Sequence, residues 1–330
     1  MAVLYRKYRP QLFSQVVNQN HIKTTLAGEI AGGQVAHAYL FVGPRGTGKT
    51  TLARLFARSL NCLKREASTI EPCNECDSCQ QMINSRSLDV IEIDAATHTQ
   101  VDNVREHIIA NAQVPPYNSK GYKLFIIDEV HMLSRAAFNA LLKIIEEPPK
   151  HVIFILATTE IRKVPPTVIS RCQRFDFKKI SVQAIIDRLR QIAVDEGVDV
   201  PHEVLAAIAR RSDGALRDAE SLLGQVISIA EGQRVTIETA SLVIPPNHWT
   251  EAETLLEALQ QRNAAAAIQY IHRLANEGRD LEEVLTDCLA YVRFVLLSKV
   301  IGAGYQPDIE EDRLATIRSL AEKFESAELT

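Results

Sequence analysis

The sequence of 330 residues contains no uninterrupted apolar segment close to the roughly 20 residues that a membrane-spanning helix requires. Its most apolar late stretch, 289–301, is interrupted by Arg293 and Lys299. Glycine and proline are few, at 14 and 13 residues, while hydrophobic residues make up 46% and charged residues 24%. This composition excludes collagen-like repeats, low-complexity sequence and intrinsic disorder. The first ten residues have basic side chains without the apolar segment of a secretory signal, so we expect a globular, cytoplasmic chain.

The charge is unevenly distributed along the chain. Residues 1–178 carry 22 Lys and Arg against 16 Asp and Glu, whereas residues 179–330 carry 15 against 25. The first 60 residues hold eight basic side chains and one acidic one. Such an asymmetry suggests a basic functional half joined to an acidic partner half, although scattered surface charge explains the counts equally well.

Short apolar runs alternate with helical periodicity between residues 35 and 175. Residues 50–60 and 136–145 each place apolar side chains on one face, which predicts amphipathic helices. The apolar runs lack strict alternation, as expected for strands buried on both faces of a parallel sheet. They span 38–42, 90–93, 124–127 and 152–157. Strands that alternate with helices predict βαβ units and therefore a doubly wound α/β domain.

The strand pattern ends near residue 178. Ser181 is a candidate cap for a helix that Gly197 would end, and Pro245-Pro246 marks a second boundary. We therefore expect an α/β domain at 1–178, a small helical domain at 179–243 and an all-helical domain at 244–330. The last domain is predicted to contain helices at 249–261, 264–277 and 281–301. Because the chain ends within helical-looking sequence, 314–328, we expect it to be part of a longer protein.

A phosphate-binding loop is predicted where the sequence matches G-x-x-x-x-G-K-[ST] between a buried strand and an amphipathic helix. Glycines let backbone amides turn toward phosphate oxygens, and the helix N-terminus adds partial positive charge. Lys49 is expected to reach the β and γ phosphates, and the Thr50 hydroxyl to bind Mg²⁺. The flanking strand and helix argue against an ordinary Gly-rich turn. The candidate nucleotide-binding residues here are Gly43, Pro44, Arg45, Gly46, Thr47, Gly48, Lys49, Thr50 and Thr51.

Two carboxylates follow the predicted strand at 124–127. Asp128 is placed to hold the Mg²⁺ through water, and Glu129 to orient and polarise the attacking water. A solvated acidic loop is the alternative. The position of the pair after a central strand, in a chain with a phosphate loop, argues against that alternative.

Four of the six cysteines lie close together in the sequence, at Cys62, Cys73, Cys76 and Cys79. Disulfides are not expected in a cytosolic ATPase, whereas four thiolates with CxxC spacing suit a closed tetrahedral Zn²⁺ site. An iron–sulfur run calls for a further Cys-Pro downstream, and a redox pair calls for its own βαβ motif. Four free thiols remain the simplest alternative. The cysteines at 172 and 288 are expected to be single buried thiols.

Several motifs together resemble the AAA+ clamp-loader ATPases, and most closely the gamma/tau members of that family. They are the phosphate loop, IDEVHML at 127–133, NALLK at 139–143, EEPP at 146–149 and SRC at 170–172. The resemblance covers nearly the whole chain. It implies an AAA+ α/β core with a zinc module at 62–79, followed by a helical lid and an all-helical collar for oligomerisation.

The resemblance also implies roles for single residues. Thr158 or Thr159 would sense the γ-phosphate, and Arg171 would be an arginine finger that reaches the ATP of a neighbouring subunit. Arg217 would be a second sensor that ties the lid to the nucleotide. Without the resemblance, Arg171 is interpreted as a member of an ordinary surface ion pair. Arg217 is then interpreted as a solvated arginine on a helix. The residues placed against adenine are Tyr8, Arg9, Pro10 and Val17.

The implied function is that of an ATP-hydrolysing motor subunit in the clamp loader of a DNA-directed DNA polymerase III holoenzyme. Its cofactors would be ATP, Mg²⁺ and structural Zn²⁺. Its partners would be clamp-loader subunits of the delta and delta-prime type, a sliding clamp and primer–template DNA, with no membrane. A hexameric AAA+ motor of the branch-migration helicase type is the first alternative, against which the cysteine module and the SRC motif argue. A non-hydrolysing AAA+ scaffold is the second, against which the intact phosphate loop argues.

Overall fold

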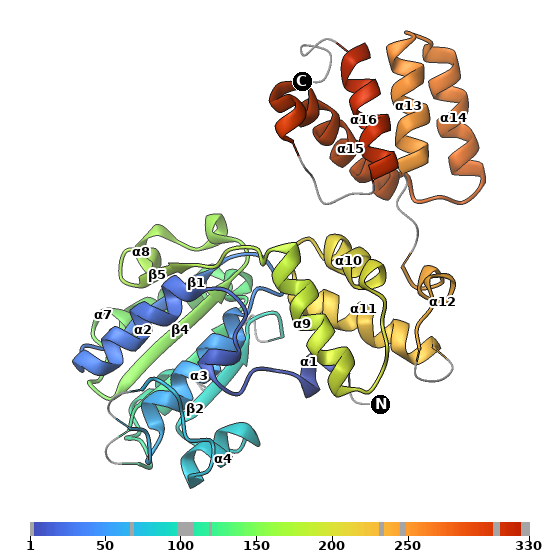
Figure 1. The fold of residues 1–330 in the computed structure, drawn as a ribbon. Helices are drawn as coiled ribbons and strands as arrows, with labels where there is room; N and C mark the ends of the chain where they lie inside the picture. The colour runs from blue at the N-terminus through green and yellow to red at the C-terminus, as the bar shows by residue number, and fades with distance from the viewer. Residues whose placement is uncertain are drawn as a thin grey trace. The chain divides into compact units, whose positions relative to one another are not determined.

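The computed structural model describes residues 3–66, 69–97, 108–118, 121–230, 234–244, 249–305 and 311–324. The chain folds into two compact units, Met1–Ile244 and Pro245–Thr330 (Figure 1). The predicted boundary at Pro245-Pro246 lies outside the described residues.

Within the described part of the first unit, five parallel strands form one sheet in the order β2-β3-β4-β1-β5. They are β1 (Ala38–Val42), β2 (Val90–Asp94), β3 (Lys123–Asp128), β4 (Val152–Thr158) and β5 (Gln173–Asp176). The first four lie where the sequence predicts strands. The sequence does not predict β5, an edge strand in which only Phe175 is buried. Because all strands run in the same direction, their carboxyl ends share one edge, where Val42 pairs with Thr158 and Asp94 with Asp128.

Helices cover both faces of the sheet (Figure 1). Alternate side chains of the strands pack against these helices. Tyr39 and Phe41 of β1 pack with helices α2 (Asn20–Gly32) and α3 (Lys49–Asn61). Leu40 and Val42 pack on the opposite face with α7 (Arg135–Glu146) and α8 (Pro166–Ile169). Burial on both faces explains why these strands are continuously apolar in the sequence.

Four helices follow the sheet and share a separate hydrophobic core. They are α9 (Val182–Asp195), α10 (His202–Arg211), α11 (Leu216–Ile229) and α12 (Ile237–Ser241). The Ser181 hydroxyl caps α9 by accepting a hydrogen bond from the N–H of Ala184, and Gly197 follows the helix in the left-handed conformation, as predicted. Leu4 of the short helix α1 (Leu4–Lys7) belongs to the same core, so the N-terminus is anchored on this helical segment.

The remaining short helices of this unit lie in connections. They are α4 (Asp77–Ile83), α6 (Ala110–Ala112) and the 3₁₀-helices Phe13–Gln15, Val130–Met132 and Ile161–Lys163.

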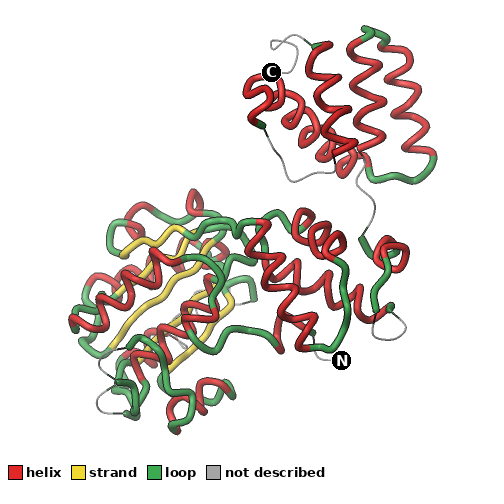
Figure 2. The backbone as a smooth tube through the Cα atoms, viewed as in Figure 1, coloured by secondary structure: helices red, strands yellow, loops and turns green. Residues whose placement is uncertain are grey.

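The second unit is helical throughout its described residues (Figure 2). Its helices are α13 (Trp249–Gln260), α14 (Ala264–Asn276), α15 (Leu281–Ile301), the 3₁₀-helix Gly302–Gly304 and α16 (Glu311–Lys323). Trp249 and Tyr291 meet edge to face at 5.7 Å in its core. The helix predicted at 314–328 begins earlier and ends earlier in the structure, and residues 325–330 lie outside the described part. No described helix is long and apolar enough to span a membrane.

Candidate functional site

The predicted phosphate loop connects the buried strand β1 to α3, and two of its glycines are required by the backbone. Gly43 has φ +154°, and a Cβ there would lie 2.6 Å from the carbonyl oxygen of Phe177. Gly46 has φ +73°, and its Cβ would lie 2.9 Å from that of Ala215. Any side chain would therefore clash with backbone or neighbouring carbon atoms. The glycines at positions 43 and 46 are thus explained by the close approach of the loop to Phe177 and Ala215.

Lys49 is buried in the first turn of α3 and folds back onto the loop. Its Nζ donates hydrogen bonds of 2.8 Å to the carbonyl oxygens of Gly43 and Pro44. Burial lowers the pKa of Lys49, while the carboxylates of Glu129 and Asp128 oppose that shift. The ammonium group therefore lies against carbonyl oxygens of the loop.

Thr50 and Asp128 meet where α3 begins and β3 ends. The Thr50 hydroxyl donates a 2.7 Å hydrogen bond to Oδ2 of Asp128, whose Oδ1 accepts a hydrogen bond from the N–H of Glu129. A hydroxyl and a carboxylate are the hard oxygen ligands that Mg²⁺ prefers. The two side chains predicted to hold the metal are thus in contact and chemically suited to it.

Glu129 adopts the left-handed conformation, with φ +46°, which is rare for this residue type. Its Oε2 accepts hydrogen bonds from the N–H and the hydroxyl of Thr159, at 3.3 and 2.9 Å. Among the described residues, none donates a hydrogen bond to Oε1. Backbone strain and Thr159 therefore fix the carboxylate while one oxygen remains available.

His131 and Thr158 form a buried layer behind this carboxylate. The Nδ1 atom of His131 lies 3.0 Å from the Thr158 hydroxyl and 3.3 Å from Oε2 of Glu129. Thr158 is fully buried, and its hydroxyl also accepts a hydrogen bond from the N–H of Glu160. The two adjacent threonines therefore differ, because Thr158 supports the fold and Thr159 contacts Glu129.

The first turn of α11 lies directly against the phosphate loop. The carbonyl oxygen of Gly46 accepts a 3.1 Å hydrogen bond from the N–H of Leu216, and Arg45 lies 3.6 Å from the carboxylate of Asp218. The guanidinium of Arg217 stacks on the ring of Tyr5, 4.6 Å from its centroid. The helical segment and the loop are thus joined by main chain and side chains.

A cavity of about 140 Å³ lies between these elements. The predicted residues that line it are Arg9, Pro10, Val17, Arg45, Gly46, Thr47, Gly48, Lys49, Thr50, Thr51, Asp128, Glu129 and Arg217. A larger hollow of about 860 Å³ adjoins it and shares Tyr5, Arg9, Pro10, Thr51 and Arg217. The phosphate-loop chemistry lies in the smaller cavity, which is therefore the candidate nucleotide site.

Besides Arg171, five residues predicted for the nucleotide site do not line this cavity: Tyr8, Gly43, Pro44, Thr158 and Thr159. Gly43 and Pro44 contribute carbonyls to Lys49, and the threonines lie behind Glu129. Tyr8 packs against the helical core, and its carbonyl oxygen accepts a 2.8 Å hydrogen bond from Nη2 of Arg188 on α9. The segment beside the cavity is thus held by the backbone of Tyr8.

Arg171 lies away from the phosphate loop of its own chain. Its guanidinium pairs with Glu146 at 2.6 Å and donates to the carbonyl oxygen of Thr167. It borders a hollow together with Ala36 and Ala38, at the end of β1 opposite to the phosphate loop. Within one chain, the structure therefore does not bring Arg171 to the nucleotide cavity.

Three further polar residues of the site have no role predicted from the sequence: Tyr5, His131 and Glu220. Tyr5 and Glu220 line the cavity, and His131 contacts Glu129. A signal exists for Glu220, because it interrupts the apolar stripe of α11 between Ala219 and Leu223, all of which are buried. His131 lies within the motif at 127–133, whereas Tyr5 carries no comparable signal.

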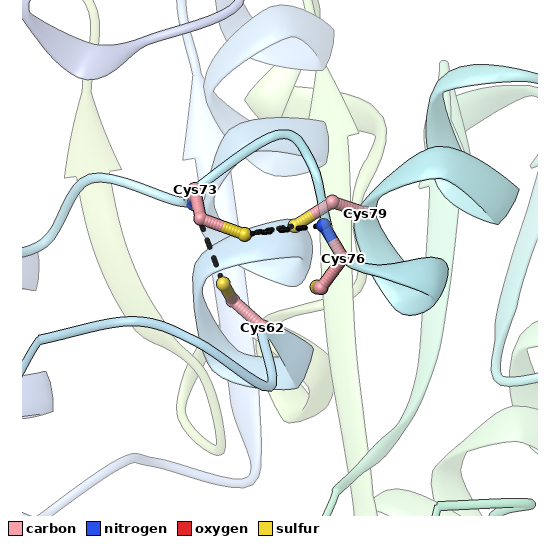
Figure 3. Close-up of side chains that lie close together, drawn as sticks. All are labelled: Cys62, Cys73, Cys76 and Cys79. Atoms are coloured by element: carbon pink, nitrogen blue, oxygen red, sulfur yellow. Dashed lines mark hydrogen bonds between the residues drawn. The ribbon is translucent and has the colours of Figure 1, made fainter.

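The four clustered cysteines converge at the end of α3 and the start of α4 (Figure 3). Their Sγ atoms lie within 4.8 Å of one another, and the N–H groups of Cys73 and Cys76 point at the sulfurs of Cys62 and Cys73, each at 3.3 Å. Zn–S bonds of about 2.3 Å in a tetrahedron place sulfurs about 3.8 Å apart. The cluster is thus consistent with a zinc site.

The environment of Cys73 favours a thiolate. Burial raises its pKa, but the N–H groups of Glu75 and Cys76 and the neighbouring thiols lower it, with a net pKa of about 6. Metal ligation requires this ionised form. The remaining cysteines, Cys172 and Cys288, are partly buried, and burial raises the pKa of each thiol, in accord with two unreactive single thiols.

The cysteine module also holds the N-terminal segment. The carboxylate of Glu71 accepts hydrogen bonds from the N–H groups of Phe13 and Ser14, at 2.7 and 2.8 Å. Asn74 donates to the carbonyl oxygen of Gln11 and accepts from Nη1 of Arg58. The module is thereby linked to the segment that carries Arg9 and Pro10.

Comparison with protein families divides the chain into three successive matches. Residues 18–181 match the model for the DNA polymerase III delta subunit. Residues 184–232 match the ATPase lid domain of the DNA polymerase III clamp loader subunit. Residues 250–330 match domain III of the DNA polymerase III subunits gamma and tau.

Individual proteins and structures agree with these matches. The chain is 44% identical over 322 residues to DNA polymerase III subunit tau of Bacillus subtilis, covering 97% of this chain and 56% of that protein. It is 36% identical over 321 residues to DNA polymerase III subunit gamma of Buchnera aphidicola, covering 97% of this chain and 87% of that protein. The chain spans about half the length of the tau relatives.

Among solved structures, the RuvB Holliday junction branch migration motor of Thermotoga maritima shares the fold. Its TM-score is 0.55 at 19% identity, over 87% of this chain and 92% of that one. At this identity the likeness concerns the fold alone. The chain itself belongs to the gamma/tau family of bacterial DNA polymerase III clamp-loader subunits.

Proposed function

We propose that this chain is the ATP-hydrolysing motor subunit of a clamp loader. In this proposal it assembles with subunits of the delta and delta-prime type, opens a sliding clamp and places it on primer–template DNA in the cytoplasm. Residues 1–178 act as the ATPase core, 179–243 as the lid and 244–330 as the collar through which subunits assemble. The contact between Thr50 and Asp128 at 2.7 Å, beside the buried Lys49, is the observation that carries the proposal.

In this proposal, different residues of the cavity bind the phosphates, the metal, the attacking water and the adenine. The loop amides and Lys49 bind the β and γ phosphates, which requires Nζ to leave the carbonyls of Gly43 and Pro44. Thr50 would hold a Mg²⁺ directly and Asp128 would hold it through water, and the ion would neutralise phosphate charge when bound. Glu129 accepts a hydrogen bond from the attacking water through Oε1. Arg9, Pro10 and Val17 bind the adenine, and Arg217 contacts the phosphates from the lid.

Thr159 is assigned as the γ-phosphate sensor. Its hydroxyl already contacts Oε2 of Glu129, whereas Thr158 is fully buried and bonded to His131 and Glu160. A residue that touches the water-orienting carboxylate can couple the presence of phosphate to the position of that carboxylate.

Structural zinc is assigned to Cys62, Cys73, Cys76 and Cys79. Four converging sulfurs with backbone N–H donors suit a closed tetrahedral site, which stabilises a loop that has little core of its own.

Clamp loading by the assembled complex tests the proposal. The full-length chain, combined with delta-type and delta-prime-type subunits, is expected to retain labelled clamp on primed circular DNA only when ATP is supplied. The Lys49→Ala assembly is expected to load none, because the triphosphate loses its buried cation. Loading that proceeds equally without ATP, or with Lys49→Ala, contradicts the proposal.

The location of Arg171 leads to a separate prediction about assembly. Because Arg171 lies at the opposite end of β1 from its own cavity, we propose that it completes the site of a neighbouring subunit. Arg171→Ala is expected to lower the ATPase rate of the complex by about 10³-fold or more, the effect of losing such an arginine. The affinity of the isolated chain for ATP, measured by titration, is expected to stay unchanged.

Arg174→Ala is the matched control, since Arg174 on β5 is exposed and pairs with Asp176. An Arg171→Ala complex that hydrolyses ATP at the unaltered rate shows that the residue serves only its ion pair with Glu146.

A further inference from the structure

A buried acidic side chain faces the candidate nucleotide cavity. Glu220 lies on α11, one turn after Leu216, and both line the cavity with Pro10 and Val17. Only 5% of Glu220 is exposed to solvent. Carboxylates are rarely buried to this degree without a partner that compensates for lost hydration.

The carboxylate of Glu220 has no hydrogen-bond donor among the described residues. The nearest cation is Arg188 on α9, whose Nε lies 3.9 Å from Oε1, beyond hydrogen-bonding distance. That Nε is itself buried without a partner, while Nη2 of Arg188 is used by the carbonyl of Tyr8. The contact is therefore a loose charge pair that leaves the acceptor capacity of the carboxylate unused.

The position of Glu220 within the cavity indicates what kind of group it meets. The phosphate end is formed by the loop, Lys49 and Asp128, whereas Glu220 lies one helical turn from Leu216, and Pro10 and Val17 are further apolar residues of the lining. Arg188 joins α9 to the backbone of Tyr8 and so places the pair beside the N-terminal segment. Apolar walls with one polar group are typical of a site for a flat heterocycle, in which the polar group fixes its identity.

We infer that Glu220 determines base specificity by accepting a hydrogen bond from the exocyclic 6-amino group of adenine. This inference rests on the proposed function of the cavity as an ATP site and goes further by naming the residue that reads the base. A 6-oxo purine presents an acceptor at the same place, which would leave two acceptors facing each other without a proton between them. Burial raises the pKa of Glu220 to about 7, so the two purines are compared above that pH, where the side chain is an ionised acceptor.

Equilibrium titration with ATP and ITP tests the inference, because these two nucleotides differ only at the N1–C6 edge of the base, where ATP has a 6-amino donor and an N1 acceptor and ITP has a 6-oxo acceptor and an N1–H donor. The full chain is expected to bind ATP at least about tenfold more tightly than ITP, the value of one hydrogen bond to a charged group. Glu220→Gln and Glu220→Leu are expected to bring this ratio to within about threefold of unity. Glu203→Gln, an exposed glutamate on α10, is the matched control and is expected to keep the wild-type ratio.

The outcomes separate this inference from the function on which it rests. A wild-type chain that binds neither nucleotide overturns both. A wild-type chain that binds ATP and ITP equally, or a Glu220→Leu variant that unfolds cooperatively and keeps the wild-type ratio, overturns the role of Glu220 and leaves nucleotide binding intact. The nearly isosteric Glu220→Gln variant decides the question if Glu220→Leu does not fold.

Discussion

Replacing Glu129 by Gln is expected to lower the DNA- and clamp-stimulated ATPase rate of the assembled complex by about 10²–10⁴-fold, the usual contribution of a positioned general base. The amide keeps the hydrogen bonds from Thr159 but cannot take a proton from water. The affinity for ATP is expected to remain near that of the wild type, since Glu129 does not bind the phosphates. Steady-state phosphate release and ATP titration measure the two quantities.

Lys49→Ala serves as the inactive reference for this experiment, and Glu147→Gln serves as the control that should behave like the wild type. Lys49→Ala removes the buried cation and is expected to abolish both ATP binding and hydrolysis. Glu147, at the exposed end of α7, is the matched acidic control and its replacement is expected to change neither. A Glu129→Gln complex that retains more than half of the wild-type turnover rules out Glu129 as the residue that activates water.

Replacing Cys73 by Ser is expected to reduce zinc affinity by more than about 100-fold, because even the loss of partners outside the ligand set costs about 10–100-fold. The wild-type chain is expected to contain about one zinc ion, as measured by atomic emission. Zinc sites of this kind contribute about 10–16 kcal/mol of apparent binding energy to folding in small peptides. Residues 62–79 of the variant are therefore expected to be cleaved rapidly by protease.

The effect of Cys73→Ser is expected to extend to nucleotide binding. Glu71 and Asn74 hold the backbone of Gln11, Phe13 and Ser14, so a disordered module releases the segment that lines the cavity. Weaker ATP binding is the expected readout. Cys288→Ala, outside the cluster, is the control. A Cys73→Ser chain that still holds stoichiometric zinc, or a wild-type chain that holds none, contradicts the assignment.

The sequence predicts those parts of the site whose residue types have only one physical explanation. Glycines are needed at positions 43 and 46, where a Cβ has no space. The CxxC spacing of the four cysteines predicts that their sulfurs converge, as they do in the structure. Buried parallel strands are also predictable, since burial on both faces makes them continuously apolar. The edge strand β5 is not, because three of its four residues are exposed and read as a polar loop.

The roles of residues that depend on tertiary contacts cannot be predicted from the sequence. Nothing local shows that Thr158 is buried against His131 while Thr159 reaches Glu129, since the two are identical, consecutive residues at the end of β4. The same applies to Arg171, whose distance from its own cavity depends on which end of β1 it borders. Glu220 can be predicted only in part. The sequence shows an acidic residue within the apolar stripe of a helix, but it does not show which group that residue faces.

The hydrogen bond from the N–H of Leu216 to the carbonyl of Gly46 connects the phosphate loop directly to the first turn of α11. A loop that rearranges around a triphosphate moves this carbonyl, and α11 must then follow or lose the bond. A Cβ at Gly46 would lie 2.9 Å from that of Ala215, so only glycine permits this approach of the loop to α11. The main-chain hydrogen bond therefore couples the position of the loop to that of α11 without using the side chain of either residue.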